Sequence, residues 1–144
     1  MKALNLTIKL RRGLGELSFG QGIDDVVAYL GEPTEIETLP MEDDTTTTVL
    51  SYDEIGLGLF FEGAGQPKLS CIETDNPETI LFGEKIFEMK QEDLVEFVKK
   101  EGLCVMDAEE EVWGEYRVTF EDAMIDFYFD KGELTVVNWG KDID

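Results

Sequence analysis

The side chains of this sequence that could do chemistry are mainly carboxylates, because other reactive groups are few. The chain contains 33 Asp and Glu, no histidine and two cysteines. The absence of histidine removes the commonest general base and the usual partner of a serine or cysteine nucleophile. Two carboxylates could still act together as they do in glycosidases, but no pattern singles out such a pair. We therefore expect no catalytic residues and no enzyme.

Metal and cofactor sites are not indicated either. The acidic runs Glu42-Asp43-Asp44 and Glu109-Glu110-Glu111 could hold calcium weakly, but neither has the ligand spacing of a calcium-binding loop. Contiguous acids rarely converge on one ion, so a solvated charge run is the favoured interpretation. Cys71 and Cys104 form no C-x-x-C arrangement and are expected to be free thiols. The sequence predicts neither a bound metal nor a cofactor.

A strand predicted near residues 123–130 carries the chemistry of a binding surface. Its residues alternate, so Ile125, Phe127 and Phe129 should face the core and their neighbours the outer face of a sheet. An outer face that mixes an aromatic ring, a thioether and carboxylates suits a protein interface. Two alternatives stay open, since exposed aromatics are common on sheets and tryptophan is more often a core residue. The candidate partner-binding residues are Met124, Asp126, Tyr128, Asp130, Phe60, Trp113 and Trp139.

The net charge narrows the class of partner. Twelve Lys and Arg against 33 Asp and Glu give a charge of −21, which repels nucleic acids and attracts basic proteins. Cutting the chain at residue 75 leaves both parts acidic, so the charge is not confined to a tail. Solubility alone is the competing explanation. The chain shows no signal-peptide pattern and no apolar run long enough to span a membrane, so a cytoplasmic protein without membrane contact is expected.

The elements expected to position these residues follow from hydrophobic periodicity. Residues 4–10 predict a strand, and residues 35–46 and 107–111 predict acidic loops. An apolar segment at residues 80–87 is expected to pack across the middle of the domain. The main helices are expected at residues 23–30 and 91–101, each followed by three strands, at 45–52, 55–61 and 69–74, and then at 116–120, 123–129 and 134–139.

The two halves repeat this order. Residues 92–139 repeat the pattern of residues 24–75, loosely but in register. For example, Asp25–Tyr29 recurs as Asp93–Phe97. We predict a single domain over residues 1–144, built of two structural repeats at about 20–75 and 89–140. The predicted fold class is α+β: two tandem helix-then-three-strand units that form one continuous antiparallel sheet, with the helices packed on one face.

The segment GIDDVVAYLGEP at residues 22–33 resembles the opening of tandem helix-plus-sheet proteins typified by β-lactamase inhibitory protein and the SmpA-type assembly lipoproteins. The likeness extends as a pattern over most of the chain. It departs from the family in two places: the second half has Lys99–Gly102 where the Pro would fall, and the lipid-carrying N-terminal Cys is absent. The resemblance implies a domain that binds another protein through its sheet face and loops.

Residues 52–57 and 80–86 also resemble small acidic bacterial proteins, some of which are immunity proteins of toxin systems. Together these observations predict a non-catalytic protein-binding domain, most concretely an immunity or inhibitor protein that neutralises a basic bacterial toxin domain, such as a nuclease, by occluding its active site. The alternative is a housekeeping sensor or scaffold module that binds a peptide or small molecule.

Overall fold

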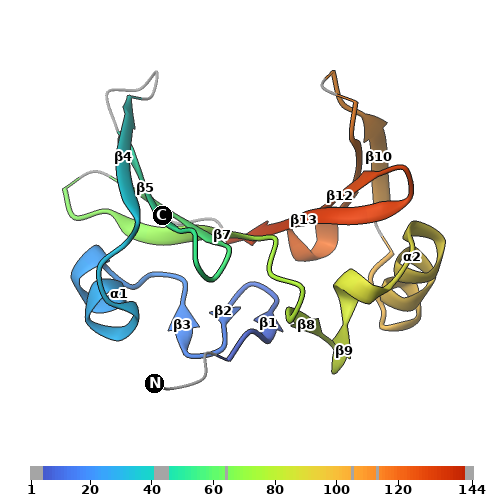
Figure 1. Cartoon of the computed structure of the whole chain (residues 1–144), viewed down its shortest axis with the longest axis horizontal. Helices are drawn as coiled ribbons and strands as arrows, with labels where there is room; N and C mark the ends of the chain where they lie inside the picture. Colours follow the sequence, from blue (N-terminus) through green and yellow to red (C-terminus); the bar gives the residue numbers. More distant parts are fainter. Residues whose placement is uncertain (1–4, 41–45, 64, 105, 113, 142–144) are drawn as a thin grey trace.

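A computed structural model of the chain describes residues 5–40, 46–63, 65–104, 106–112 and 114–141. An eight-stranded antiparallel sheet dominates this part of the chain, with the strand order β10-β11-β12-β13-β7-β6-β5-β4 (Figure 1). One side of the sheet contains β4 (Glu35–Pro40), β5 (Thr46–Tyr52), β6 (Leu57–Glu62) and β7 (Lys68–Thr74). The other side contains β10 (Met106–Glu110), β11 (Tyr116–Phe120), β12 (Ile125–Asp130) and β13 (Glu133–Gly140). The pairing of β7 with β13 joins the two sides.

The remaining elements are short. They comprise α1 (Ile23–Leu30) and α2 (Gln91–Lys100), a small sheet of β1 (Ile8–Lys9), β2 (Gly13–Leu14) and β3 (Leu17–Ser18), the pair β8 (Ile80–Leu81) and β9 (Glu84–Lys85), and the 3-10 turns η1 (Ile86–Glu88) and η2 (Glu121–Ala123). The two α-helices and the small strands lie on one side of the large sheet, which leaves its other face uncovered by any described element (Figure 1).

Each α-helix has acidic residues in its first turn, where they suit the helix dipole, and α2 also has basic residues in its last turn. Asp24 and Asp25 lie in the first turn of α1, and α2 has acids in its first turn and Lys99 and Lys100 in its last. Gly31 ends α1 with a φ of 89°, and its N–H donates to the carbonyl oxygen of Val27 at 2.7 Å. These helices therefore begin and end close to where the sequence predicts.

The predicted fold class is wrong. Strands take up 49% of the structure and helices 19%, so the fold is mostly β rather than α+β built from helix-then-three-strand units. Four strands of the large sheet, not three, follow each of the two α-helices. The additional strands are β4 and β10, which fall in the acidic stretches predicted to be loops.

Edge pairing explains this error. Strand β4 carries Glu35 and Glu37, and β10 carries Asp107, Glu109 and Glu110, all of which have low strand propensity. Both strands are nevertheless fully registered against a neighbour, β4 against β5 and β10 against β11. They are the two edges of the sheet, where charged residues are tolerated and discourage further pairing. Residues 41–45 of the first predicted loop, including the run Glu42-Asp43-Asp44, lie outside the described residues.

The core lies between the sheet and the elements that cover it. Its buried residues extend from Ile8 to Trp139 and include Val26 of α1 and Leu94 and Val98 of α2. In the segment at residues 80–87, Leu81 and Ile86 are buried, in agreement with its predicted packing role. The strand predicted at residues 4–10 is shortened to β1 among the described residues, while Ile80 N–H donates to Leu6 at 3.0 Å and ties this region to β8.

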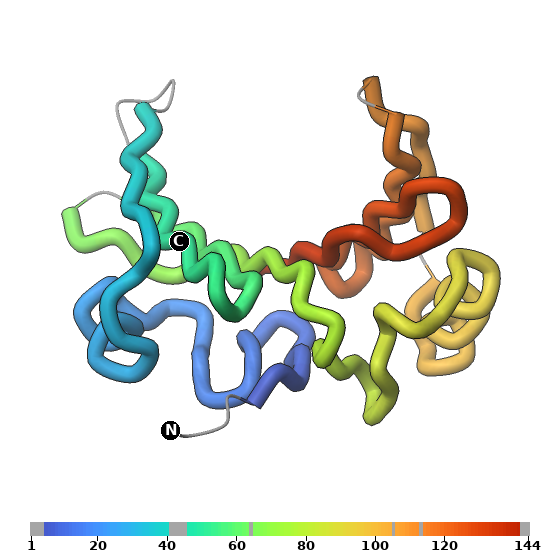
Figure 2. Tube along the Cα trace, in the orientation of Figure 1, coloured from blue at the N-terminus to red at the C-terminus, as the bar shows by residue number. Residues whose placement is uncertain are grey.

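The large sheet is curved. Register shifts of the kind that a β-bulge produces leave Ser70 of β7 without a partner opposite Phe60 and Phe61, and Thr135 of β13 without one opposite Tyr128 and Phe129. A bulge bends its strand and increases the local twist. The Cα trace shows the outer strands of both sides rising away from the helices, so the uncovered face is concave (Figure 2). Among the described residues, neither α-helix is long and apolar enough to cross a membrane.

A candidate protein-binding face on the concave sheet

The concave face is crossed by one continuous row of paired residues, which we call the acidic row. Strand register places one residue from each strand in this row, and four of its eight members are carboxylates, whereas none is basic. From one edge to the other the row is Glu35, Ser51, Gly58, Glu73, Asn138, Asp126, Thr119 and Asp107. Neighbouring strands lie about 4.8 Å apart, and the four carboxylates are two or three strands from one another, so they are spaced roughly 10–14 Å apart across the face.

The adjacent row on the same strands shows that the acidic row faces away from the core. Its members are Ile36, Leu50, Leu59, Ile72, Trp139, Ile125, Phe120 and Met106, and the six between the edge strands are completely buried. Successive side chains of a strand point to opposite faces. The acidic row therefore lies on the face that no described helix covers.

Glu73 has the most unusual environment in the row. It is half-buried on β7, and among the described residues no Lys or Arg forms an ion pair with it. Burial raises the pKa of Glu73, and the nearby carboxylates of Asp75 and Glu115 raise it further. A carboxylate in this position loses hydration without gaining a positive neighbour, so it would interact favourably with a cation brought by another molecule.

Arg117 organises the acidic residues near the β10 edge. Its Nε donates to Glu111 Oε1 at 2.8 Å, and its Nη2 lies 3.1 Å from Glu109 Oε2 and 3.5 Å from Asp107 Oδ2. The hydrogen bond that Arg117 donates to Glu111 is the main cause that raises the pKa of Arg117 above its ordinary value. Arg117 also donates to Thr119, which in turn donates to Asp126 of the acidic row. Three carboxylates around one guanidinium leave this end of the face negative.

Of the predicted partner-binding residues in and next to β12, three lie on the concave face and Met124 lies just before the strand. Asp126, Tyr128 and Asp130 lie on the concave face, and Ile125, Phe127 and Phe129 between them are buried, as the alternation predicts. Burial and the carboxylate of Asp126 raise the pKa of Tyr128. Met124 precedes the strand in a left-handed conformation with a φ of 53° and lines a wide depression of about 770 Å³ together with Asp126, Asn138 and Cys71.

The other three candidates are more scattered. Phe60 is half-buried and pairs with Cys71, next to the acidic row on the concave face. Trp139 is completely buried and its indole Nε1 donates to the carbonyl oxygen of Gly13 at 2.9 Å, so it belongs to the core and does not reach a partner. Trp113 lies outside the described residues.

Sequence reasoning missed Glu73, Asn138 and Arg117 on this face. Their strands were predicted, but the place of each residue depends on its cross-strand neighbour, and no local pattern gives the register of β7 against β13. A usable signal existed for Gly58, because a glycine inside a strand often marks close approach by another chain.

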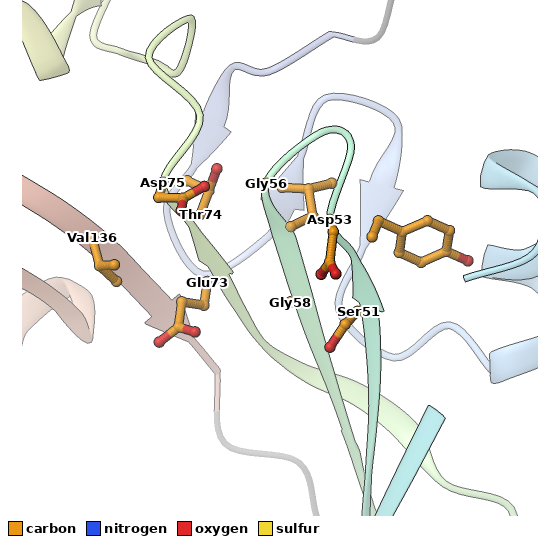
Figure 3. A pocket seen from close by; sticks show the side chains of 10 residues that line it. Ser51, Asp53, Gly56, Gly58, Glu73, Thr74, Asp75 and Val136 are labelled. Atoms are coloured by element: carbon orange, nitrogen blue, oxygen red, sulfur yellow. The ribbon is translucent and has the colours of Figure 1, made fainter. Parts of the chain in front are cut away.

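A cavity of about 320 Å³ opens on the concave face at Gly58. It is lined by Ser51, Tyr52, Asp53, Gly56, Leu57, Gly58, Glu73, Thr74, Asp75 and Val136. Figure 3 shows Glu73 and Ser51 on either side of the bare strand at Gly58, with Asp53 and Asp75 toward one end. We call this cavity the Gly58 slot. Its polar lining is entirely neutral or acidic.

Two observations describe the reactive groups near this face. Burial, followed by the carboxylate of Glu73, raises the pKa of Cys71 to about 12, which keeps this thiol protonated and a poor nucleophile. Within the described residues, no group of three or more His, Cys, Asp or Glu is arranged to hold a metal ion. The face presents carboxylates and a few aromatic rings on a curved surface.

Comparison with known proteins adds a likeness of fold. No protein-family model and no curated protein matches the chain. The chain is similar to the crystal structure of an extracellular protein containing an SCP domain from Bacillus anthracis str. Ames, with a TM-score of 0.50 and 19% identity. The match covers 94% of this chain and 50% of that chain, so this chain spans half the length of its structural neighbour. At this identity the similarity shows a shared fold alone.

Proposed function

We propose that this chain is a non-catalytic protein-binding domain whose concave face receives a basic protein. The observation that carries the proposal is the acidic row, which crosses the whole sheet and contains four carboxylates and no basic residue. A face of this charge raises the association rate of a positively charged partner and rejects acidic ones. Its curvature suits a convex partner, because the outer strands rise on both sides (Figure 1).

The most concrete form of the proposal is an immunity or inhibitor protein. A toxin domain that acts on nucleic acid has a basic active-site cleft, and an acidic concave face that covers the cleft would block its substrate. The resemblance of the sequence to inhibitory and immunity proteins supports this form. An immunity protein of this kind would act in the cytoplasm, and cell fractionation would test that location. A sensor or scaffold module that binds a peptide or small molecule stays the alternative.

A pull-down with matched charge variants tests the proposal. The immobilised chain is exposed to lysate of its own cells at low and high salt, and captured proteins are identified by mass spectrometry. The test variant carries Glu73→Gln and Asp126→Asn, which remove two charges from the acidic row. The control carries Glu96→Gln and Glu101→Gln, which remove two exposed charges in and just after α2.

We expect the wild type and the control to capture a basic protein at low salt. The test variant should not capture it, and high salt should release it from the wild type. Calorimetry with the purified partner should then show at least a tenfold weaker affinity for the test variant, corresponding to about 1.4 kcal/mol. A partner held equally by both variants would place binding elsewhere and contradict the proposal.

A further inference from the structure

Gly58 has no structural reason to be a glycine. Its φ lies outside the left-handed region, and a Cβ built on it would meet only ordinary contacts, with Glu73 Cβ, Glu73 Oε2 and a Phe60 ring carbon all at 3.8 Å. Glycine in a strand interior also weakens the strand. Neither the backbone nor the packing at this position accounts for the missing side chain.

Two other glycines of the same region differ in this respect. Gly56 has a φ of 66°, and a Cβ there would lie 2.3 Å from Asp75 Oδ1. A Cβ on Gly140 would lie 2.7 Å from the carbonyl oxygen of Ser70, where β13 meets β7. The fold requires both of these glycines. Gly58 is instead the one of the three at which a Cβ would meet only ordinary van der Waals contacts.

The space that Gly58 leaves open is the Gly58 slot, and its lining fits a long basic side chain. Glu73 flanks the floor on one side and Ser51 on the other, since the register pairs both residues with Gly58. Val136 adds an apolar wall, and Asp53 and Asp75 add further carboxylates (Figure 3). A Lys or Arg can bury its aliphatic stem along an apolar wall while its charged head reaches a carboxylate.

We propose that the Gly58 slot receives one Lys or Arg side chain from the basic partner, with its cationic head against Glu73 and its stem over Gly58 and along Val136. This inference rests on the proposed function and names the contact through which the concave face holds its partner. A cation in the slot would neutralise the half-buried carboxylate of Glu73. Charge-assisted hydrogen bonds to a carboxylate are among the stronger polar contacts in proteins.

NMR titration with a minimal probe tests the slot. The probe is the blocked tripeptide Gly-Arg-Gly, and its control replaces Arg with citrulline, which has nearly the same shape without the charge. We expect the arginine peptide to shift the backbone amide signals of Gly58, Glu73 and Asp75 saturably, with a Kd on the order of 1 mM. The citrulline peptide should leave these signals in place. Equal shifts with both peptides, or no saturable shift, would overturn the inference.

Three variants sharpen the test. Gly58→Val fills the slot and should abolish the shifts of the arginine peptide at Glu73 and Asp75 while the protein stays folded, as its remaining spectrum will show. Glu73→Gln should weaken the arginine peptide at least fivefold. Glu37→Gln removes one charge from the same face outside the slot, on β4, and should change the affinity less than twofold. Similar weakening by the two charge variants would indicate general attraction and contradict a specific slot.

The slot and the proposed function can fail separately. If the arginine peptide does not bind but a basic partner is lost from the variant with Glu73→Gln and Asp126→Asn, the slot inference is overturned and the proposed function stands. If the arginine peptide saturates the slot while capture of the partner is unchanged by these substitutions, the slot binds a cationic side chain, but the proposed function and the partner's use of the slot are both overturned.

Discussion

The indole Nε1 of Trp139 lies 2.9 Å from the carbonyl oxygen of Gly13, which joins the end of β13 to the small sheet near the N-terminus. The two residues are 126 positions apart in the sequence, and both are buried. This hydrogen bond ties the last strand of the large sheet to the layer beneath it. It explains why Trp139, whose aromatic ring made it a binding candidate, stabilises the core.

Trp139→Phe should therefore destabilise the fold. The substitution removes the donor to Gly13 and part of a fully buried ring, and we expect a loss of about 1–3 kcal/mol in the free energy of unfolding. Chemical denaturation followed by circular dichroism will measure it. Val49→Thr, on the concave face, serves as the control and should change stability by about 0.5 kcal/mol or less. Equal stabilities of the two variants would contradict the core role of Trp139.

Removing Arg117 should loosen the β10 edge. Arg117→Leu leaves Asp107, Glu109 and Glu111 close together without their shared cation, so their mutual repulsion is no longer offset. We expect faster hydrogen exchange in β10 and a loss of about 1 kcal/mol in stability, since exposed ion pairs contribute little individually and more as a network. Arg117→Lys keeps the charge but loses the planar guanidinium fork, so its stability and its exchange rate in β10 should lie between those of the wild type and of Arg117→Leu. Unchanged exchange in β10 would refute this role.

Glu73→Gln should raise stability near neutral pH. The folded state raises the pKa of Glu73, so the folded chain binds this proton more tightly than the unfolded chain does. Its ionisation therefore reduces stability as the pH rises through the folded pKa, and the penalty is absent below the ordinary value of 4.5. We expect the variant to be more stable than wild type near neutral pH, with the difference shrinking on acidification. A variant that is less stable near neutral pH would contradict the assigned environment.

Gly58 in β6 and Gly56 in the turn before it should respond oppositely to substitution. Gly58→Val adds a β-branched side chain whose Cβ meets only ordinary contacts, and it should stabilise the fold by about 0.5–1 kcal/mol. Gly56→Ala places a Cβ 2.3 Å from Asp75 Oδ1 at a φ of 66° and should cost about 1–3 kcal/mol. Thermal unfolding of both variants measures the contrast. A destabilised Gly58→Val protein would mean that folding, rather than a partner, requires this glycine.

Local sequence patterns predicted most elements but not the fold class. Periodicity placed α1 and α2, and alternation identified Ile125, Phe127 and Phe129 as inward-facing. The edge strands β4 and β10 were missed because their acidic residues have low intrinsic strand propensity, and pairing with β5 and β11 outweighs that preference. The predicted unit of one helix and three strands is wrong, because four strands follow each α-helix. The correspondence between the two halves of the sequence stays a prediction.

The candidate site was less predictable than the fold. Asp126 and Tyr128 were found because they lie on one strand whose alternation is visible in the sequence. The acidic row could not be found in this way, since it takes one residue from each of eight strands and depends on seven separate registers. Trp139 was predicted to bind a partner but is buried, because the sequence around an aromatic residue near a strand end does not distinguish a core position from an interface position.

Carboxyl footprinting of the complex with the captured basic partner tests the central claim most directly. Carbodiimide-driven amidation labels accessible Asp and Glu side chains, and mass spectrometry reads the labelling of each one with and without the partner. The account predicts that Glu35, Glu73 and Asp126 are protected on binding, whereas Glu92 and Glu96 of α2 react as in the free chain. Protection of the α2 carboxylates, with the acidic row still labelled, would contradict it.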